Sequence, residues 1–510
     1  MAYSKINSRN DQLNRIVAAV RRRLQRLVNI AIRIIGSKYF LWGVIIFFVL
    51  QAMWIAFSFR YPMLYDEVFH VGVIRIFGHQ LSPFIVNQPE SYDLYGDLST
   101  GGATIYHYLM SFPYRLISVI SDNYKIQIIF LRILNILMAA GGLLLFSKLF
   151  KKVGIRQIFT NIALLIFILL PIVPFVAATV NYDNMLFILT AWYLILCVRI
   201  LQSKKVTWYD YAWLVIVGCF ASLAKYPFLP IFAISVIYLA IFVFKRYGRH
   251  FRLEFIQSLR LARRRTLITI SIVLVITTGM FSAVYLKNIV LYGSPNPDCV
   301  TKMSEKRCLQ NGVAKRALRL IASIDERPLQ SPSSYANQWF NKVLRYAFWT
   351  GSSTAQGITR VKYMPILESV VFFSLFVAIT CLAYVWRSLR KNSSWYFLIA
   401  ISITLIAALF LKNYSSYLKY HAIIATQARY LLTVVPIMLV MSIVAINYIF
   451  KRRRSLKLIV LLIILFLFTQ GGGIITHILK SEDSWYWQNQ KVIEANHLAK
   501  KILQPLIKEN

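Results

Sequence analysis

Residues 40–59, FLWGVIIFFVLQAMWIAFSF, and the segment YDEVFH at 65–70 decide how this chain is interpreted. The first stretch holds no charged residue over about 20 positions, which is the length that crosses a bilayer as an α-helix. The second stretch places two adjacent carboxylates, Asp66 and Glu67, close to the end of the apolar one. These two stretches therefore predict a membrane-spanning helix that is followed by two acids.

The composition of the whole chain agrees with a membrane protein. Hydrophobic residues make up 58% of the 510 residues, whereas soluble chains run at roughly 45–50% apolar. This content excludes a disordered basic chain as well as a soluble enzyme. The net charge is +39, but the basic residues lie between apolar runs rather than on the face of a soluble fold, so no nucleic-acid partner is expected.

The predicted fold class is an all-α polytopic membrane protein with about 11 transmembrane helices. The apolar runs begin near Phe40, Ile126, Ile158, Asn184, Tyr211, Phe228, Leu267, Ile366, Trp395, Ala428 and Leu458. A further run from Ile105 to Ile120 is shorter and contains Pro113 and Arg115. We therefore predict that it forms a re-entrant or interfacial helix rather than a span.

Basic residues set the predicted orientation, because every second connection between these runs is rich in Lys and Arg. The basic groups include Arg21–Arg23, Lys151–Lys152, Lys204–Lys205, Lys245–Arg249, Arg387–Lys391 and Lys451–Arg454. The positive-inside rule places these connections and the N-terminus in the cytoplasm. Of the acids, only Asp11, Asp210 and Glu254 then fall on the cytoplasmic side, so polar chemistry is expected on the extracytoplasmic face.

This orientation divides the chain into five parts. They are a basic cytoplasmic amphipathic arm (1–37), an N-terminal transmembrane catalytic module (38–286) with its first outer loop (60–125), an extracytoplasmic helical cap (287–365), C-terminal transmembrane helices (366–480) and an extracytoplasmic amphipathic tail (481–510). Cys299 and Cys308 lie in the cap, where the sequence leaves a disulfide and two free thiols as alternatives.

Asp66 and Glu67 are the strongest candidates for chemistry. Apolar residues recur at near-helical spacing as far as Phe77, so the two acids would open an interfacial helix and could stabilise its dipole without any other role. The alternative is a general base at the membrane surface, with Glu67 and His70 steering it or binding a divalent metal. A lone ExxH pattern lacks the further ligands that a metal needs, so the metal ligands stay unknown.

Other candidates lie in later outer connections. Asp183 is the only acid between Gln157 and Arg199, and a polar turn or a functional acid would each explain it. The cationic candidates are Lys225, Lys419, His421 and Arg429, and Tyr430 follows the last of them. Such groups either extend to lipid headgroups or hold an anionic phosphate, for which the Arg fork is well suited.

These motifs, in this order, resemble the GT-C glycosyltransferases, which include protein O-mannosyltransferases and aminoarabinose transferases. The matching features are Asp66-Glu67 with His70, the segment Ala103–Tyr108, the span from Arg132 to Lys152, Pro171 and Pro174 before Asp183, and Gln427, Arg429 and Tyr430. The two prolines that many members carry in the second of these segments are absent here. The resemblance is best over residues 38–230.

The resemblance implies a bacterial-type enzyme of the cell membrane that moves a sugar from a polyprenyl-phosphate donor to a lipid, glycan or protein acceptor at the extracytoplasmic face. It assigns the catalytic acids to Asp66 and to Asp183, and we expect Glu67 to take part beside Asp66. We expect Lys225, Arg429 and Tyr430 to hold the donor phosphate. The remaining substrate contacts are expected from His70, Tyr106, His107, Lys419 and His421. No cofactor is required, and a divalent metal is an open alternative.

Polyprenyl phosphate is a good leaving group, so one carboxylate that deprotonates the acceptor hydroxyl suffices for an inverting single displacement. Asp66 is the expected base, with Glu67 or Asp183 orienting it or the acceptor. The alternatives are a membrane transporter or lipid-linked glycan flippase, for which Arg132 is the main intramembrane candidate, and a non-enzymatic assembly protein. The assembly protein would tolerate replacement of Asp66.

Overall fold

The computed structural model describes residues 19, 23, 25–99, 104–353, 359–363, 379–380, 382–387, 392–451 and 454–506. Within these residues, six helices are long and apolar enough to cross a membrane. They are α2 (Lys38–Ser58), α5 (Tyr124–Lys152), α8 (Tyr182–Gln202), α10 with its preceding turn (Tyr226–Tyr247), α12 continued into α13 (Arg264–Tyr292) and α19 (Ser393–Tyr420). Each coincides with one of the apolar runs of the sequence, which confirms those six predictions of long apolar helices.

Four further runs form shorter helices, α6 (Gln157–Ile168), α9 (Trp208–Ala224), α20 (Val435–Ile449) and α21 (Arg454–Thr469). The run that starts at α6 is interrupted before Pro171, and a separate short helix α7 (Ile172–Ala177) follows. Proline removes a backbone donor and restricts the residue before it, so a break at this point is expected. The run near Ile366 lies outside the described residues, and the count of about 11 spans stays a prediction.

The remaining described elements are short and connect or cover the long helices. They are α3 (Glu67–Gly78), η1 (Glu90–Tyr95), α4 (Ile105–Ile120), α11 (His250–Arg260), α14 (Cys299–Lys302), α15 (Glu305–Cys308), α16 (Gly312–Ala322), η4 (Ile324–Glu326), α17 (Pro332–Arg345), β1 (Trp349–Ser353), β2 (Thr359–Tyr363), η5 (Ala428–Leu431), α22 (Ile474–Lys480), η6 (Asp483–Trp485), α23 (Gln490–Leu503) and η7 (Gln504–Leu506). Of the predicted basic arm, residues 25–35 are helical and residues 1–18 lie outside the described part.

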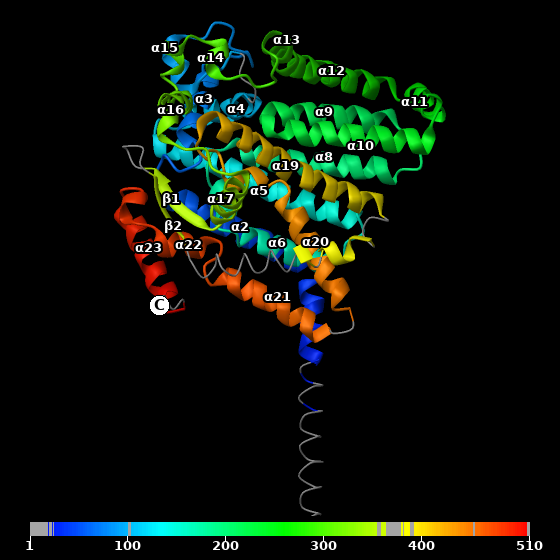
Figure 1. Ribbon diagram of the computed structural model, residues 1–510. Helices are drawn as coiled ribbons and strands as arrows, with labels where there is room; N and C mark the ends of the chain where they lie inside the picture. Colours follow the sequence, from blue (N-terminus) through cyan, green and yellow to red (C-terminus); the bar gives the residue numbers. More distant parts are fainter. Residues whose placement is uncertain are drawn as a thin grey trace, which may run out of the picture.

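The long helices form a bundle in which α5 packs against α2 and α8, and α9 packs against α8 and α12. Figure 1 shows α8, α9, α10 and α12 running side by side. Polar residues start several of these helices, because their side chains accept hydrogen bonds from the first-turn N–H groups. The capping residues are Ser37 for α2, Asn123 for α5 and Asn181 for α8.

The segments that were predicted to lie outside the cell gather at one end of the bundle. Figure 1 shows α3, α4, α14, α15, α16, β1 and α23 at that end, whereas α11 lies at the opposite end. Helix α4 packs against α3, and among the described helices it is not one of the candidate spans. This arrangement accords with an interfacial α4, while the side of the membrane stays a prediction.

The cap segment contains the disulfide that the sequence left open, because Cys299 and Cys308 are bonded. It also departs from the helical cap that was expected, since β1 and β2 form an antiparallel pair in which Trp349 is opposite Tyr363. These strands contain Trp, Thr, Val and Tyr, which favour extended backbone. Residues 354–358 and 364–365 of the predicted cap lie outside the described part.

Candidate functional site

Glu67 opens α3 and is fully buried in an ion pair with Arg132 of α5. Arg132 donates from Nε to Glu67 Oε1 and from Nη2 to Oε2, each at 2.8 Å. The backbone N–H groups of Met63 and Val180 donate to the same two oxygens at 2.6 and 3.2 Å. A carboxylate has about four acceptor positions, and all four are used here. Glu67 therefore holds α3 in place and has no acceptor position left for a substrate.

Arg132, the intramembrane cation that a transporter would use, has a structural role in this arrangement. Its Nη1 donates to the carbonyl oxygens of Ala56 and Phe59 at 2.9 and 2.6 Å. Both acceptors belong to the end of α2, so one guanidinium joins α2, α3 and α5. Bidentate Arg–carboxylate geometry of this kind gives strong, oriented hydrogen bonds.

Asp66, by contrast, is half-exposed and has a strained backbone. Its side chain is 55% exposed, and the φ angles of Tyr65 and Asp66 are 66° and 68°. Two consecutive non-glycine residues in this left-handed region cost energy and persist only where neighbours hold them. The carbonyl oxygen of Tyr65 accepts hydrogen bonds from Arg429 at 3.0 Å and from Asn181 at 2.8 Å. These contacts aim the Asp66 carboxylate at the Arg429 guanidinium, 2.5 Å away.

Asp183 approaches the same guanidinium from the start of α8. Its backbone N–H donates to the Asn181 side chain at 2.8 Å, which fixes the first turn of the helix. The buried carboxylate pairs through Oδ1 with the ammonium of Lys225, and its Oδ2 lies 3.9 Å from Nε of Arg429. Arg429 therefore lies between two carboxylates that are far apart in the sequence, with a second cation beside it.

Aromatic rings surround the Lys225 ammonium. The nitrogen lies 4.4 Å from the ring centre of Tyr182 and 4.7 Å from that of Tyr430, and the Arg429 guanidinium lies 5.4 Å from the Tyr430 ring. Cation–π contacts of this kind are stronger when desolvated. Lys225 lies in the connection between α9 and α10. Burial lowers the pKa of its ammonium to about 8, although the nearby Asp183 carboxylate acts to raise it.

A pair of buried histidines adjoins this cluster. Nδ1 of His70 and Nε2 of His107 share a hydrogen bond of 2.9 Å, and the His70 ring lies 4.4 Å from that of Tyr182. The Tyr106 hydroxyl donates to Asn135 at 3.0 Å and its ring contacts His70. Burial, with smaller effects from nearby cations, lowers the pKa of His70 well below its usual range, so the His70 ring is neutral at pH 7.

The structure brings nine of the eleven predicted site residues into one cluster. The other two, Lys419 and His421, bind the cap segment. Lys419 pairs with Asp298 at 2.5 Å, and the His421 ring is hydrogen-bonded to the carbonyl oxygen of Arg327 at 2.7 Å. Contacts of Lys419 and His421 with a substrate stay a prediction.

Two asparagines of the site were not identified from the sequence. Asn135 accepts hydrogen bonds from Tyr106, from the backbone of Asn181 and from Asn184, at 3.0 to 3.2 Å. Asn181 was seen only as part of a polar turn, yet it supports Tyr65 and Asp183. The available signal was that Asn135 is a polar residue in an apolar helix, three positions after Arg132, and so on nearly the same face.

Several buried polar atoms of this cluster lack a hydrogen-bond partner within the described residues. They are Nε2 of His70, Oδ2 of Asp183, Nε of Arg429 and Oε1 of Gln427. Buried polar groups normally have hydrogen-bond partners. A bound ligand or water molecules in this cluster would supply the partners that these four atoms lack.

The alternative of a divalent metal stays a prediction. The described residues include no group of three or more His, Cys, Asp or Glu side chains that could hold a metal ion. The guanidinium of Arg429 lies between Asp66 and Asp183, where a bridging cation would have to be. The two carboxylates are therefore already matched to Arg429 and Lys225.

No family model matches the chain, and no curated protein matches it. Among solved structures, it is similar to the oligosaccharyltransferase of Archaeoglobus fulgidus in a complex with Zn and sulfate, at 12% identity and a TM-score of 0.48, covering 88% of this chain and 54% of that one. The same protein tethered to an acceptor peptide gives 12% identity, a TM-score of 0.47 and coverages of 89% and 56%. Its complex with an inhibitory peptide and a dolichol-phosphate gives 11% identity and a TM-score of 0.44, and the match covers 91% of this chain and 56% of that one.

The chain thus spans about half the length of these solved structures. A TM-score below 0.5 does not establish a shared fold, so the GT-C resemblance stays a proposal.

Proposed function

We propose that this chain is a GT-C-type glycosyltransferase that moves a sugar from a polyprenyl-phosphate donor to an acceptor hydroxyl at the extracytoplasmic membrane face. The observation that supports this most is the pairing of two carboxylates, Asp66 and Asp183, with two buried cations, Lys225 and Arg429. Transfer from a phosphate leaving group needs one group of each kind, a base for the acceptor and cations for the phosphate.

Asp66 is the proposed base, because its carboxylate is half-exposed and has one charged partner, whereas Glu67 is fully engaged. Asp66 takes the proton of the acceptor hydroxyl as that oxygen attacks the anomeric carbon of the donor sugar. The bond between this carbon and the phosphate oxygen breaks, and polyprenyl phosphate leaves with the bonding electrons. This single displacement inverts the anomeric configuration.

Lys225 and Arg429 are the proposed phosphate ligands. In the structure their two positive charges are balanced by Asp66 and Asp183. A donor phosphate that enters the cluster competes with these carboxylates for Arg429, and its binding releases Asp66 towards the acceptor. The cations then stabilise the negative charge that grows on the departing phosphate. Donor binding before acceptor binding follows from this exchange.

Purified protein in liposomes, supplied with polyprenyl-phosphate sugars, tests this function. Transfer of the sugar to a hydroxyl acceptor supports the proposal. Movement of the intact lipid between leaflets without transfer would identify a transporter or flippase instead. Neither transfer nor movement with any donor, from protein that is folded by size-exclusion chromatography, would favour an assembly role.

A further inference from the structure

Helix α23 is fixed across the end of the bundle, away from the carboxylate cluster. Figure 1 shows it crosswise to the long helices, at the end that carries α3 and the cap. Asn496 anchors it, because its side chain accepts a hydrogen bond from the Trp54 indole at 3.0 Å and donates one to Ser58 at 3.1 Å. Both partners lie in the last turns of α2. If α2 spans the bilayer, α23 lies at the level of the lipid headgroups.

The side of α23 opposite Asn496 carries charged residues and two exposed apolar side chains. Leu498 and Ile502 are 61% and 60% exposed. They are four residues apart, so they lie on one side of the helix, one turn from each other. An amphipathic helix with exposed leucine and isoleucine beside lysines is typical of segments that lie in the membrane interface.

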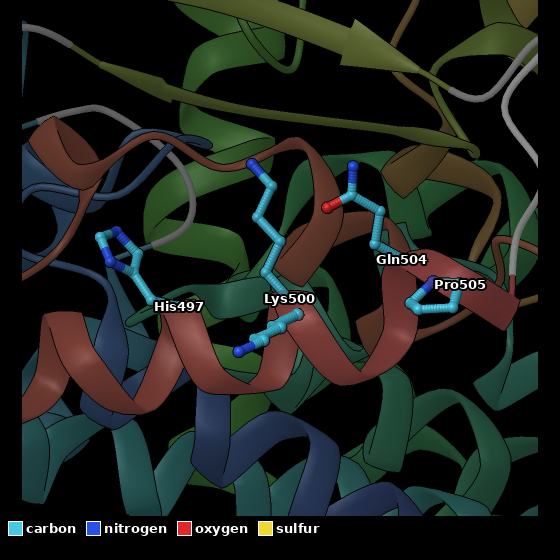
Figure 2. Close-up of a pocket in the computed structure, with 5 residues that line it drawn as sticks. His497, Lys500, Gln504 and Pro505 are labelled. Carbon is cyan, nitrogen blue, oxygen red and sulfur yellow. The ribbon is translucent and has the colours of Figure 1, made fainter.

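A surface hollow of about 450 Å³ adjoins these residues. It is lined by His497, Lys500, Lys501, Gln504 and Pro505, and Figure 2 shows the side chains of His497 and Gln504 on the same side of α23.

The charge of the hollow is positive. Neither Lys500 nor Lys501 has an ion pair within the described part of the chain, whereas His497 contacts Asp483 at 2.7 Å. Asp483 precedes α23, and the acid within the helix, Glu494, accepts a hydrogen bond from Gln490. The ammonium groups of Lys500 and Lys501 therefore have no paired carboxylate within the described residues. Asp483 offsets any positive charge on His497.

We propose that this hollow binds the headgroup of an anionic phospholipid. The phosphodiester lies between the ammonium groups of Lys500 and Lys501, and the acyl chains cover Leu498 and Ile502. Lysine near an anionic lipid surface contributes about fivefold to affinity per residue. The apolar pair beside the cations favours a lipid over a free phosphate ion. This site does not depend on the proposed transfer reaction.

Native mass spectrometry of the full-length protein in neutral detergent tests the proposal, with phosphatidylglycerol, phosphatidylcholine or inorganic phosphate added. We expect the wild type to retain phosphatidylglycerol over phosphatidylcholine, and Lys500→Gln/Lys501→Gln to lose about 25-fold in phosphatidylglycerol affinity. Lys491→Gln is the matched control, because Lys491 is an exposed lysine of the same helix outside the hollow. It should retain the lipid.

Equal retention of phosphatidylglycerol by the double variant and the wild type would overturn the proposal. Displacement of the lipid by equimolar inorganic phosphate would identify a free-phosphate site instead, which also overturns it. None of the substituted side chains is buried, so a loss of binding is not confused with unfolding. A variant with Leu498→Ser should bind more weakly than the wild type and more tightly than the double-lysine variant.

Discussion

Asp66 and Glu67 are neighbours in the chain, yet their carboxylates have opposite surroundings. The Glu67 side chain is fully buried and accepts four hydrogen bonds, whereas the Asp66 side chain is 55% exposed and contacts one guanidinium. The backbone of Asp66 is left-handed, whereas Glu67 begins helix α3. Of these two adjacent acids, Glu67 therefore positions helix α3, while Asp66 is the one that can reach a substrate.

The Glu67–Arg132 pair should dominate the stability of the α2–α3–α5 junction. Glu67→Gln leaves the buried Arg132 charge without its counter-ion, so we expect a loss of about 3–5 kcal/mol in the free energy of unfolding. The double variant Glu67→Gln/Arg132→Met removes the orphaned charge and should be more stable than the single variant. Thermal unfolding of the purified variants in detergent measures both. A single variant as stable as the wild type would contradict this role.

The pKa of Lys225 predicts a pH dependence of donor use. The ammonium is charged below about pH 8 and loses its proton as the pH rises through that value, since burial lowers its pKa from 10.5 to about 8. Because kcat/KM reports the free enzyme, kcat/KM for the donor should fall tenfold per pH unit above about pH 8. Lys225→Arg keeps the charge and should remove this fall. A wild-type profile that stays flat to pH 9.5 would refute the role of Lys225.

Most residues of the candidate site could be predicted one by one from the sequence, but the contacts between them could not. Acids at the ends of apolar runs, such as Asp66 and Asp183, stand out because charge is rare there. Which acid meets which cation depends on how α8 and the segment before α20 pack, and no local pattern encodes that. The same reason explains why Asn135 was missed and why Lys419 was grouped with Arg429.

At the scale of elements, the disulfide-closed segment α14–α15 holds the first outer loop. Arg307 donates to both oxygens of Asp93 at 2.6 Å and to the carbonyl oxygen of Gln88 at 3.1 Å. Lys302 pairs with Asp97 at 3.1 Å. We call these two ion pairs the cap clamp. The clamp holds η1, and η1 packs against α3, which begins at the acids Asp66 and Glu67.

The packing of η1 against α3 explains this connection. A Cβ atom on Gly72 of α3 would come within 2.2 Å of the Tyr95 ring, so only glycine allows this close approach. Asp66 and Glu67 lie at the start of the same helix. A change in the cap is therefore expected to reach the acids through α3.

Arg307→Ala should loosen the cap clamp, since it removes both hydrogen bonds to the buried Asp93. We expect limited proteolysis between residues 299 and 345 to become several-fold faster, while Lys306→Ala, an exposed neighbour, leaves the rate unchanged. Hydrogen bonds from Arg307 lower the pKa of Asp93 below 3.8. The clamp is thus present at neutral pH and is lost only as the pH falls below that value. Equal proteolysis of Arg307→Ala and wild type would argue against the clamp.

At the scale of the whole molecule, the predicted orientation places the cap and α11 on opposite sides of the membrane. Glu326→Cys in the cap should react with a membrane-impermeant maleimide in intact cells, in a background without cysteines 197, 219 and 381. Arg252→Cys in α11 should react only after the membrane is opened. The reverse pattern would invert the topology and move the carboxylate cluster to the cytoplasm.

Long apolar runs predicted the described bundle helices well because spanning length and apolar content are local properties. Pro171 indicated where the run near Ile158 ends, but the separate helix α7 that follows it was not predicted. The β1–β2 hairpin was also missed, because two five-residue strands carry too weak a pattern beside the cap helices. Contacts such as Asp93 with Arg307 join residues more than 200 positions apart.

Asp66 is the proposed base of a sugar transfer at this end of the bundle, and a comparison of three proteins tests this role. Sugar transfer from a polyprenyl-phosphate donor is measured for the wild type, Asp66→Asn and Asp122→Asn, an exposed acid in the connection between α4 and α5. We predict a loss of about 10²–10⁴-fold for Asp66→Asn and wild-type transfer for Asp122→Asn. Near-normal transfer by folded Asp66→Asn protein would show that Asp66 is not the base.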